Sequence, residues 1–326
     1  MLERLREPWS DHRAERVLGA VASLVLVLIV LMIAFIAVKA WPSLQHNGLH
    51  VFGNGPVDEQ ISTQVNTGVK PTAAELRLTA WPLIYATLVT TALAGAVGLL
   101  FALFASIFIV EFAPPRLRKL IVPIVRLLAA VPSVIYGLIG ILVLAKFVGD
   151  HLISEQRARS VEYVVQLNGT SVLVAVVVLT VMITPIMIAI ITDALYAVPK
   201  GWREGSLALG VNRWRAMWTV SVRACRPAIA AAVVLACTRA LGEAIMLSMV
   251  SGSRGFAPNP LDGITMLFEP LRPLAATIAE NVESLNAPAL RSSVYLFALM
   301  LLFSSFVLSI GAYLAKQPMR KYGMRA

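Results

Sequence analysis

Charged residues are scarce in this chain of 326 residues, in which Asp, Glu, Lys and Arg make up 14% and hydrophobic residues 58%. A soluble domain has roughly 25% charged residues, because water must solvate most of its surface. The scarcity of charge therefore excludes a soluble globular protein. We predict an integral membrane protein, whose structural unit is an apolar run of about 20 residues.

Residues for redox, metal or nucleotide chemistry are also few, with two cysteines and four histidines. Cys225 is expected at the membrane surface and Cys237 inside the bilayer, so no disulfide is predicted. His46 and His50 lie four residues apart around Gly48, which disfavours the helix that would align them on a metal. The sequence has no Gly-x-x-x-x-Gly-Lys-Ser/Thr loop and no nucleophile–base constellation. We therefore expect no cofactor, no metal and no enzymatic activity.

What the chain does have is long apolar runs. Backbone groups in lipid must be paired within one helix or in a closed barrel, and these runs lack the alternation of barrel strands. The predicted fold class is all-α, a polytopic membrane protein with six transmembrane helices. The predicted spans are residues 17–40, 81–110, 124–148, 171–192, 227–250 and 292–315.

The distribution of Lys and Arg predicts the orientation. Seventeen lie in the N-terminal arm, the tail and the loops after the second and fourth spans, against seven in the alternate segments. By the positive-inside rule the arm (1–16) and the tail (316–326) are cytoplasmic. Residues 41–80 are then an extracytoplasmic loop, expected to be irregular, and 274–282 are expected to form a short helix at the outer interface. The net charge of +10 is explained by topology and needs no nucleic-acid partner.

The predicted cytoplasmic loop 193–226 carries a helical pattern. Apolar residues recur on one face at Leu207, Val211, Trp214 and Trp218, and Gly210 is expected to divide the segment into two short helices. Two interpretations are open on periodicity alone. The segment either rests on the membrane surface through its tryptophans or docks onto a cytoplasmic protein.

Two ionisable residues lie inside the fifth predicted span. Arg239 and Glu243 are spaced i, i+4, which would place them on one helix face, close enough to pair. A charge at this depth costs roughly 2.5–3.5 kcal/mol. The pair is therefore either a static salt bridge between helices or the polar lining of a translocation path, with Arg239 offering a fork of donors to an anion and Glu243 holding that arginine.

The third predicted span contains a proline followed by polar residues. Pro132 leaves a backbone carbonyl without its helical hydrogen bond. Ser133 and Tyr136 either donate to the groups freed at this kink or contact a substrate. In the second span, small residues are expected to form a packing seam against a neighbouring helix. These small residues are Ala92, Ala94, Gly95, Ala96 and Gly98.

The loop 193–226 resembles the EAA loop of ABC-importer permeases. The matching residues are Glu204-Gly205-Ser206, Gly210 and Val220-Ser221-Val222; Gly205 and Ser206 stand where the family has alanines, and Arg223 where it has proline. The resemblance implies a coupling helix that inserts into a groove of the ATPase subunit. Glu204 and Gly210 are the positions that it carries over.

Three further motifs resemble permeases of the phosphate-specific transport (Pst) system. They are Val131–Gly137, Arg239–Glu243 and the run Glu111-Phe112-Ala113-Pro114, the last of which resembles the C-type permease more than the A-type. The resemblance implies a type I ABC importer permease in a bacterial plasma membrane. It also implies a second permease subunit, two ATPase subunits, an extracytoplasmic phosphate-binding protein and a translocation path that includes Arg239, Glu243, Ser133 and Tyr136.

Two alternatives remain at this point. A permease for another oxyanion would share the EAA-like loop, but it should lack the Arg-x-x-x-Glu pair. A proton-coupled secondary transporter would use Glu243 as proton carrier and would leave the coupling-like loop unexplained.

Overall fold

The computed structural model describes residues 11–66, 76–154, 156 and 167–319, and within these ranges every regular element is a helix. The N-terminal and central elements are α1 (Asp11–Asn47), η2 (Gly48–Phe52), α2 (Val57–Val65), α3 (Trp81–Ile107), η3 (Phe108–Phe112), α4 (Pro115–Ala129), α5 (Ser133–Ile139), η4 (Gly140–Ala145) and α6 (Lys146–His151). The remainder are α8 (Val172–Ala197), α9 (Lys200–Ala208), α10 (Arg213–Ala216), η5 (Met217–Val222), α11 (Arg226–Leu241), α12 (Ile245–Val250), η6 (Pro260–Phe268), α13 (Leu274–Glu280), η7 (Val282–Ser284) and α14 (Pro288–Met319).

Five helical segments are long and apolar enough to cross a membrane. A sixth is obtained if 213–222 and 226–241, which meet at 75°, count as one span. The all-α membrane fold is thus confirmed. The fourth span is longer than expected, because α8 continues to Ala197 and the loop that follows begins after it rather than at residue 193.

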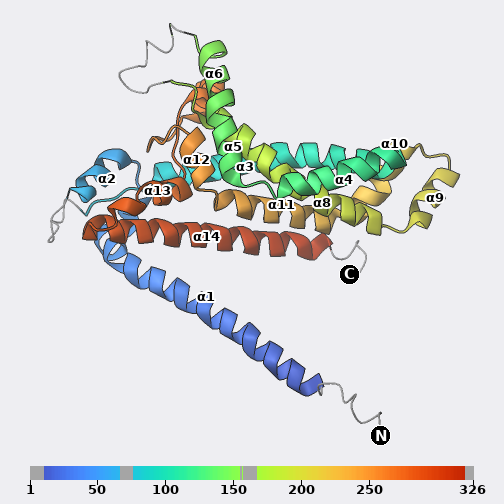
Figure 1. The fold of residues 1–326 in the computed structure, drawn as a ribbon, viewed down its shortest axis with the longest axis horizontal. Coiled ribbons are helices and arrows are strands. Elements are labelled where there is room, and N and C mark those ends of the chain that lie inside the picture. The colour runs from blue at the N-terminus through green and yellow to red at the C-terminus, as the bar shows by residue number, and fades with distance from the viewer. Residues whose placement is uncertain (1–10, 67–75, 155, 157–166, 320–326) are drawn as a thin grey trace.

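The centre of the molecule is a bundle in which α3, α8 and α11 run side by side with α14 (Figure 1). Small residues of α3 allow the close approach. A Cβ added to Gly98 would lie 2.7 Å from Met187 Cε of α8, and one added to Gly95 would lie 2.8 Å from Cys237 Sγ of α11. The predicted seam is therefore confirmed for Gly95, Gly98 and the buried Ala94, whereas Ala92 and Ala96 lie on the exposed side of α3.

The third predicted span, 124–148, is broken in the structure. Helix α4 lies along the bundle against α8, and α5, η4 and α6 turn steeply away from it (Figure 1). The break falls at Ala130–Pro132, because Pro132 lacks an N–H donor and keeps the residue before it out of the helical region. The apolar span of this part of the chain is 133–151.

The fifth span is also broken. Helix α11 ends at Leu241, and α12 begins only at Ile245. Gly242 follows α11 with ψ near 0°, so the chain leaves the helix one turn after Arg239. The prediction of a continuous helix over 227–250 is therefore wrong, and the break lies at the predicted ionisable pair.

The outer segment 41–80 is more ordered than predicted. Helix α1 continues to Asn47, and η2 and α2 follow it. Val51, Val57 and Ile61 join Leu290 and Phe297 of α14 in a second apolar core at this end of the bundle. Helix α13 forms where predicted, but its residues 274–277 are buried against neighbouring helices rather than lying at an interface.

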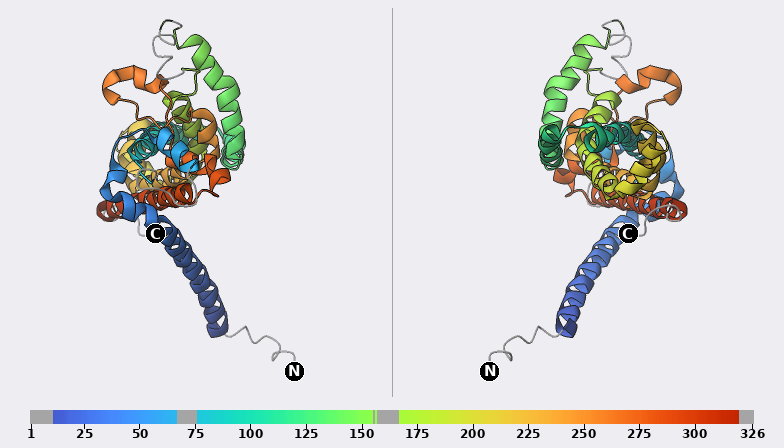
Figure 2. Two further views of the ribbon diagram at one scale, coloured as in Figure 1. Left: turned by 90° about the vertical axis from the view of Figure 1, so that its left-hand side faces the viewer. Right: turned by 90° about the vertical axis from the view of Figure 1, so that its right-hand side faces the viewer.

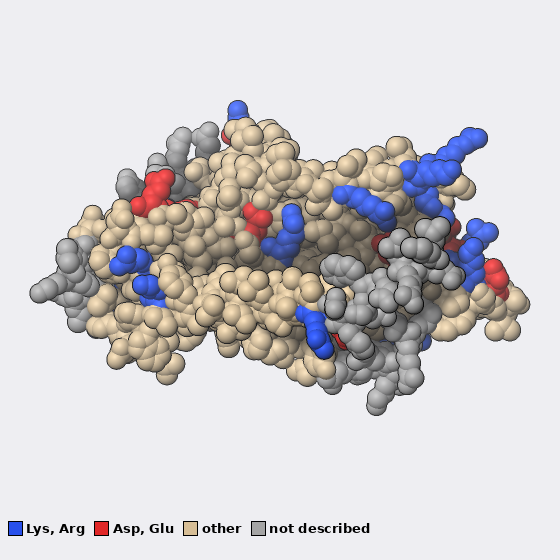
Figure 3. Space-filling model, turned by 60° about the horizontal axis from the view of Figure 1, so that its bottom comes forward, with Lys and Arg blue, Asp and Glu red and all other residues tan. Residues whose placement is uncertain are grey.

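Helix α1 departs from the bundle. The C-terminal part of α1 packs on α14, and its N-terminal part extends away from the bundle (Figure 2). The apolar side chains of this extended part are exposed. The first described turn of α1, the last of α14 and helix α9 lie at the same end of the long axis (Figure 1). Several Lys and Arg side chains gather at this end (Figure 3).

Candidate functional site

Helix α9 projects from one end of the bundle and has no buried residue. Pro199 precedes it in an extended conformation, which suits the start of a helix because proline has no N–H to lose. The side chains of Trp202 and Leu207 are exposed, and Leu209 just after the helix is 85% exposed. The predicted coupling residue Glu204 is exposed as well. Helix α9 thus presents charged and apolar groups that its own chain leaves uncovered.

The turn after α9 depends on Gly210. Its φ of +81° lies in the left-handed region, which only glycine adopts at little cost. Gly210 N donates to Leu207 O at 2.9 Å, and Val211 N donates to Ser206 O at 3.3 Å. These two bonds form a Schellman motif, which satisfies the last carbonyls of α9 and reverses the chain. The expected division into two short helices is confirmed.

Helix α10 fixes the other side of this turn. The Asn212 side chain accepts a hydrogen bond from Arg215 N at 2.8 Å and so caps the helix. Trp214 stacks on Phe104 of α3, and Trp218 meets the same ring edge-on, each with centroids 6.3 Å apart. The tryptophan face therefore packs on this chain's own helix α3, and α9 is left as the uncovered element.

One ion pair ties α9 to the bundle. Arg203 Nη1 donates to Glu111 Oε2 at 2.9 Å, and both side chains are less than one-fifth exposed. Close by, Arg118 donates to the carbonyls of Ile109 and Val110 at the end of η3. No local pattern in the sequence predicts the Arg203–Glu111 contact, because the two residues are 92 positions apart.

Arg239 and Glu243 are not paired as predicted. Arg239 lies exposed in the last turn of α11, and Glu243 lies in the break that follows. Glu243 Oε1 accepts a hydrogen bond from Met246 N at 3.2 Å and thereby caps α12. Within the described residues, no ion pair or hydrogen bond engages the Arg239 guanidinium. The helix ends before the i, i+4 geometry can form, and the cation is left without an acid.

Tyr136 repairs the break in the third span. Its hydroxyl donates to Leu128 O at 2.9 Å, so it satisfies a carbonyl at the end of α4. Within the described residues, no hydrogen bond joins Tyr136 to Arg239 or to Glu243. Ser133, half-buried, is the first residue of α5. A Cβ on Gly137 would lie 3.0 Å from Met249 Sδ, which shows how closely α5 packs on α12.

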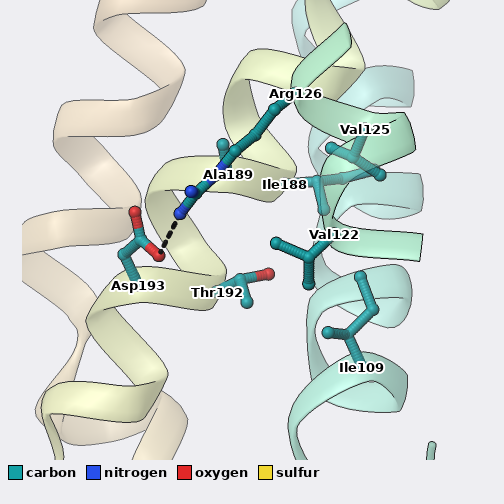
Figure 4. A pocket seen from close by; sticks show the side chains of 8 residues that line it. All are labelled: Ile109, Val122, Val125, Arg126, Ile188, Ala189, Thr192 and Asp193. Carbon is teal, nitrogen blue, oxygen red and sulfur yellow. Dashed lines mark ion pairs between the residues drawn. The ribbon is translucent and has the colours of Figure 1, made fainter. Parts of the chain in front are cut away.

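A second polar feature lies between α4 and α8 (Figure 4). Arg126 Nη2 and Asp193 Oδ1 are 3.5 Å apart at the rim of a small pocket of about 10 Å³. Apolar side chains form most of the wall, and the buried hydroxyl of Thr192 points inward without a hydrogen-bond partner. Because Arg126 and Asp193 neutralise each other, this pocket is a poorer anion site than the surroundings of Arg239.

Relatives of known sequence are membrane transport components. The chain is 32% identical over 297 residues to the phosphate transport system permease protein PstC 1 of Mycobacterium tuberculosis, covering 87% of this chain and 86% of that protein. It is 32% identical over 253 residues to the probable ABC transporter permease protein YqgH of Bacillus subtilis, covering 77% and 75%. A probable phosphate transport system permease protein PstC of Methanocaldococcus jannaschii is 28% identical over 90% of both chains.

The fold also matches a solved transporter. A chain of the bacterial alginate ABC transporter, crystallised in complex with an alginate pentasaccharide-bound periplasmic protein, superposes with a TM-score of 0.59. The match covers 98% of this chain and 100% of the other at 12% identity, so it speaks for the fold alone.

A family model described as the binding-protein-dependent transport system inner membrane component matches residues 96–321. The match includes α9, the Gly210 turn and the broken span with Arg239. The relatives are transport permeases rather than enzymes, which agrees with the expectation from the sequence. The chain is a multi-pass membrane protein and belongs to the family of inner membrane permease components of binding-protein-dependent ABC transporters.

Proposed function

We propose that the chain is the C-type permease subunit of an ATP-driven importer of inorganic phosphate. The observation that carries this proposal is the cation of Arg239 at the end of α11, next to the break before α12 and without an acidic partner among the described residues. The similarity to permeases named for phosphate transport supports the same substrate.

Arg239 supplies the chemistry that an oxyanion needs. Its planar guanidinium offers a rigid fork of donors that matches two oxygens of a phosphate. An unpaired charge in a membrane span costs a few kcal/mol, and an arriving anion lowers that cost. Ser133 stands at the start of α5, where its hydroxyl adds a donor to the same path.

Glu243 acts in this proposal through structure rather than through charge pairing. Its carboxylate holds the start of α12, and α12 in turn packs on α5. The break between α11 and α12 therefore keeps one shape while Arg239 stays free for the anion. This role differs from that of a proton carrier, which would need to bind and release a proton.

Energy is supplied by separate ATPase subunits. Glu204 and Gly210 belong to the exposed end formed by α9 and its turn, which is the element that docks into an ATPase groove in this proposal. When ATP binding closes two ATPases, α9 moves, and α10–η5 and the Arg203–Glu111 pair transmit the movement to α3. The membrane helices then alternate between inward and outward access around Arg239.

The remaining partners follow from what the chain leaves uncovered. Helix α1 exposes apolar side chains along most of its length, which suits a second permease subunit beside it in the membrane. An extracytoplasmic phosphate-binding protein delivers the substrate. The excess of Lys and Arg at the end where α9 lies supports cytoplasmic termini.

Phosphate uptake by proteoliposomes that contain the assembled transporter tests the proposal. Arg239→Gln should abolish uptake while the complex still assembles, and Arg291→Gln, an exposed arginine at the other end of the bundle, is the matched control. Normal uptake by the Arg239→Gln protein would refute the role of this residue. Competition by sulfate or phosphonate as strong as that by phosphate would favour the alternative substrate class.

A second pair of variants separates the importer from a proton-coupled transporter. Glu243→Gln keeps an oxygen that accepts from Met246 N, so uptake should continue, whereas Glu243→Ala removes the cap and should reduce it. If both variants lose uptake and the unchanged protein takes up phosphate without ATP, Glu243 would instead be identified as a proton carrier.

A further inference from the structure

A second polar cavity lies at the opposite end of the bundle from α9. It has a volume of about 850 Å³ and is lined by the end of α1, η2, the start of α2 and residues 77–79. Its polar side chains are those of His46, Asn47, His50, Asn54, Gln60, Arg77 and Thr79. Among the described residues that line it there is no Asp or Glu, and Arg77 carries a permanent positive charge. Clefts lined by one sign of charge concentrate ions of the other sign.

The backbone around Arg77 is held from three sides. The buried Asn47 donates to Leu76 O and accepts from Leu78 N, both at 2.9 Å. Gln64 Nε2 donates to Arg77 O at 3.4 Å. The guanidinium itself has no partner among the described residues. Arg77 thus combines a backbone that is held in place with an exposed guanidinium. The fixed backbone reduces the conformational entropy that is lost when the side chain is ordered around a ligand.

The side chain of Gln60 is fixed with its donor unused. Gln60 Oε1 accepts from Thr79 N at 2.7 Å and from Thr79 Oγ1 at 3.0 Å. Because the oxygen is occupied, the amide Nε2 is left as a hydrogen-bond donor to the cavity. Gly55 lies against this pair, since a Cβ there would be 2.7 Å from Thr79 Oγ1 and 3.3 Å from Gln60 Nε2.

Asp58 of α2, two residues before Gln60, has its hydrogen-bond and ion-pair partners outside the cavity. It accepts from Gly255 N at 3.0 Å and pairs with Arg272, which also pairs with Glu280 of α13. Asp58 therefore neutralises Arg272 rather than the cavity. Glu59, its neighbour, is exposed and does not line the cavity. His46 and His50 do not gather a third metal ligand, because no group of three His, Cys, Asp or Glu occurs among the described residues.

We propose that this cavity binds a phosphate group through Arg77, with His50 and the Gln60 amide as further donors. The ligand is either free inorganic phosphate or the headgroup of an anionic phospholipid, which share this chemistry. Leu49 and Phe52 of η2, 85% and 55% exposed, lie beside the cavity and suit the acyl region of a lipid. The site is separate from Arg239 and does not depend on the proposed transport activity.

Two binding measurements on the assembled complex test the site and distinguish the sources. The first is equilibrium binding of radiolabelled inorganic phosphate in nanodiscs of neutral phosphatidylcholine, in an Arg239→Gln background that removes the site on α11. The second is native mass spectrometry of the complex after detergent exchange, which counts retained phosphatidylglycerol. Both compare the unchanged cavity with Arg77→Gln and His50→Gln, and Arg291→Gln serves as the control.

Arg77→Gln should weaken one of the two ligands by at least about tenfold, because it removes a charged hydrogen-bonding fork. Loss of inorganic phosphate identifies a free-anion site, and loss of phosphatidylglycerol identifies a lipid site. His50→Gln should have a smaller effect in the same direction, and it replaces Arg77→Gln if that variant fails to assemble. Equal retention of both ligands by the cavity variants and the Arg291→Gln control would overturn the proposal.

Discussion

Replacing Gly210 tests whether the shape of the α9–α10 turn matters for coupling to the ATPase. For a residue with a Cβ, the left-handed conformation that Gly210 adopts costs roughly 1–2 kcal/mol. No atom lies within 4 Å of a Cβ built at this position, so the cost is one of backbone conformation alone. Since 1.4 kcal/mol is a factor of ten in an equilibrium constant, Gly210→Ala should lower the equilibrium constant for forming the native turn about five- to thirtyfold. Gly210→Val should lower it further, and Gly210→Asn least.

Helix α9 provides the matched control. Gly205 also has open space around its Cβ position, but it lies inside the helix with an ordinary negative φ. Gly205→Ala should therefore strengthen the helix by about 0.5–1 kcal/mol and leave the turn unchanged. It also restores the alanine of the EAA pattern, so the partner surface should accept it.

The assay is ATP hydrolysis by the reconstituted complex in the presence of the loaded binding protein, together with the affinity of the ATPase subunits for the permease pair. We expect both to fall in the order Asn, Ala, Val at position 210 and to be retained in Gly205→Ala. Full coupling by Gly210→Val would refute the importance of the turn. An equal loss in Gly205→Ala would show that α9 is sensitive to any added methyl group.

Three further changes test the packing of the site. Tyr136→Phe removes one donor from the Leu128 carbonyl, which still accepts from Val131 N at 3.3 Å, so the melting temperature of the complex should fall by the equivalent of about 0.5–1.5 kcal/mol; an unchanged value would contradict the repair role. Gly98→Val places a branched side chain against α8 and should cost about 1–3 kcal/mol or prevent assembly, as judged by size-exclusion chromatography. A double-mutant cycle of Arg203→Ala and Glu111→Ala should give a coupling on the order of 1 kcal/mol in ATPase affinity, and strict additivity would exclude the ion pair as a link.

Local chemistry accounts for the successful predictions. Gly210 ends α9 because glycine adopts a positive φ without a steric penalty. Pro132 interrupts the third span because proline has no backbone N–H to donate. Both effects act within a few residues, so the sequence shows where they occur. It does not show how far the chain turns afterwards, so the bounds 124–148 differ from the apolar span 133–151 of the structure.

The prediction for Arg239 and Glu243 shows the limit of spacing arguments. An i, i+4 pair meets only if the helix continues, and α11 ends at Leu241. Glu243 then finds a nearer partner in the free N–H of Met246 at the start of α12. The sequence placed both residue types in the fifth span, but the partner of each side chain depended on where the helix ended.

The sequence by itself determined that the chain is a helical membrane protein, because few charges and runs of about 20 apolar residues allow no other fold. It also marked Arg239 and the Gly210 turn, whose chemistry is local. Only the tertiary structure decided that Arg203 meets Glu111 and that, among the described residues, Arg239 has no acid partner and the cavity beside Arg77 has no carboxylate. Contacts between distant residues are set by how helices pack, and packing depends on the shape of the whole bundle rather than on any short stretch of sequence.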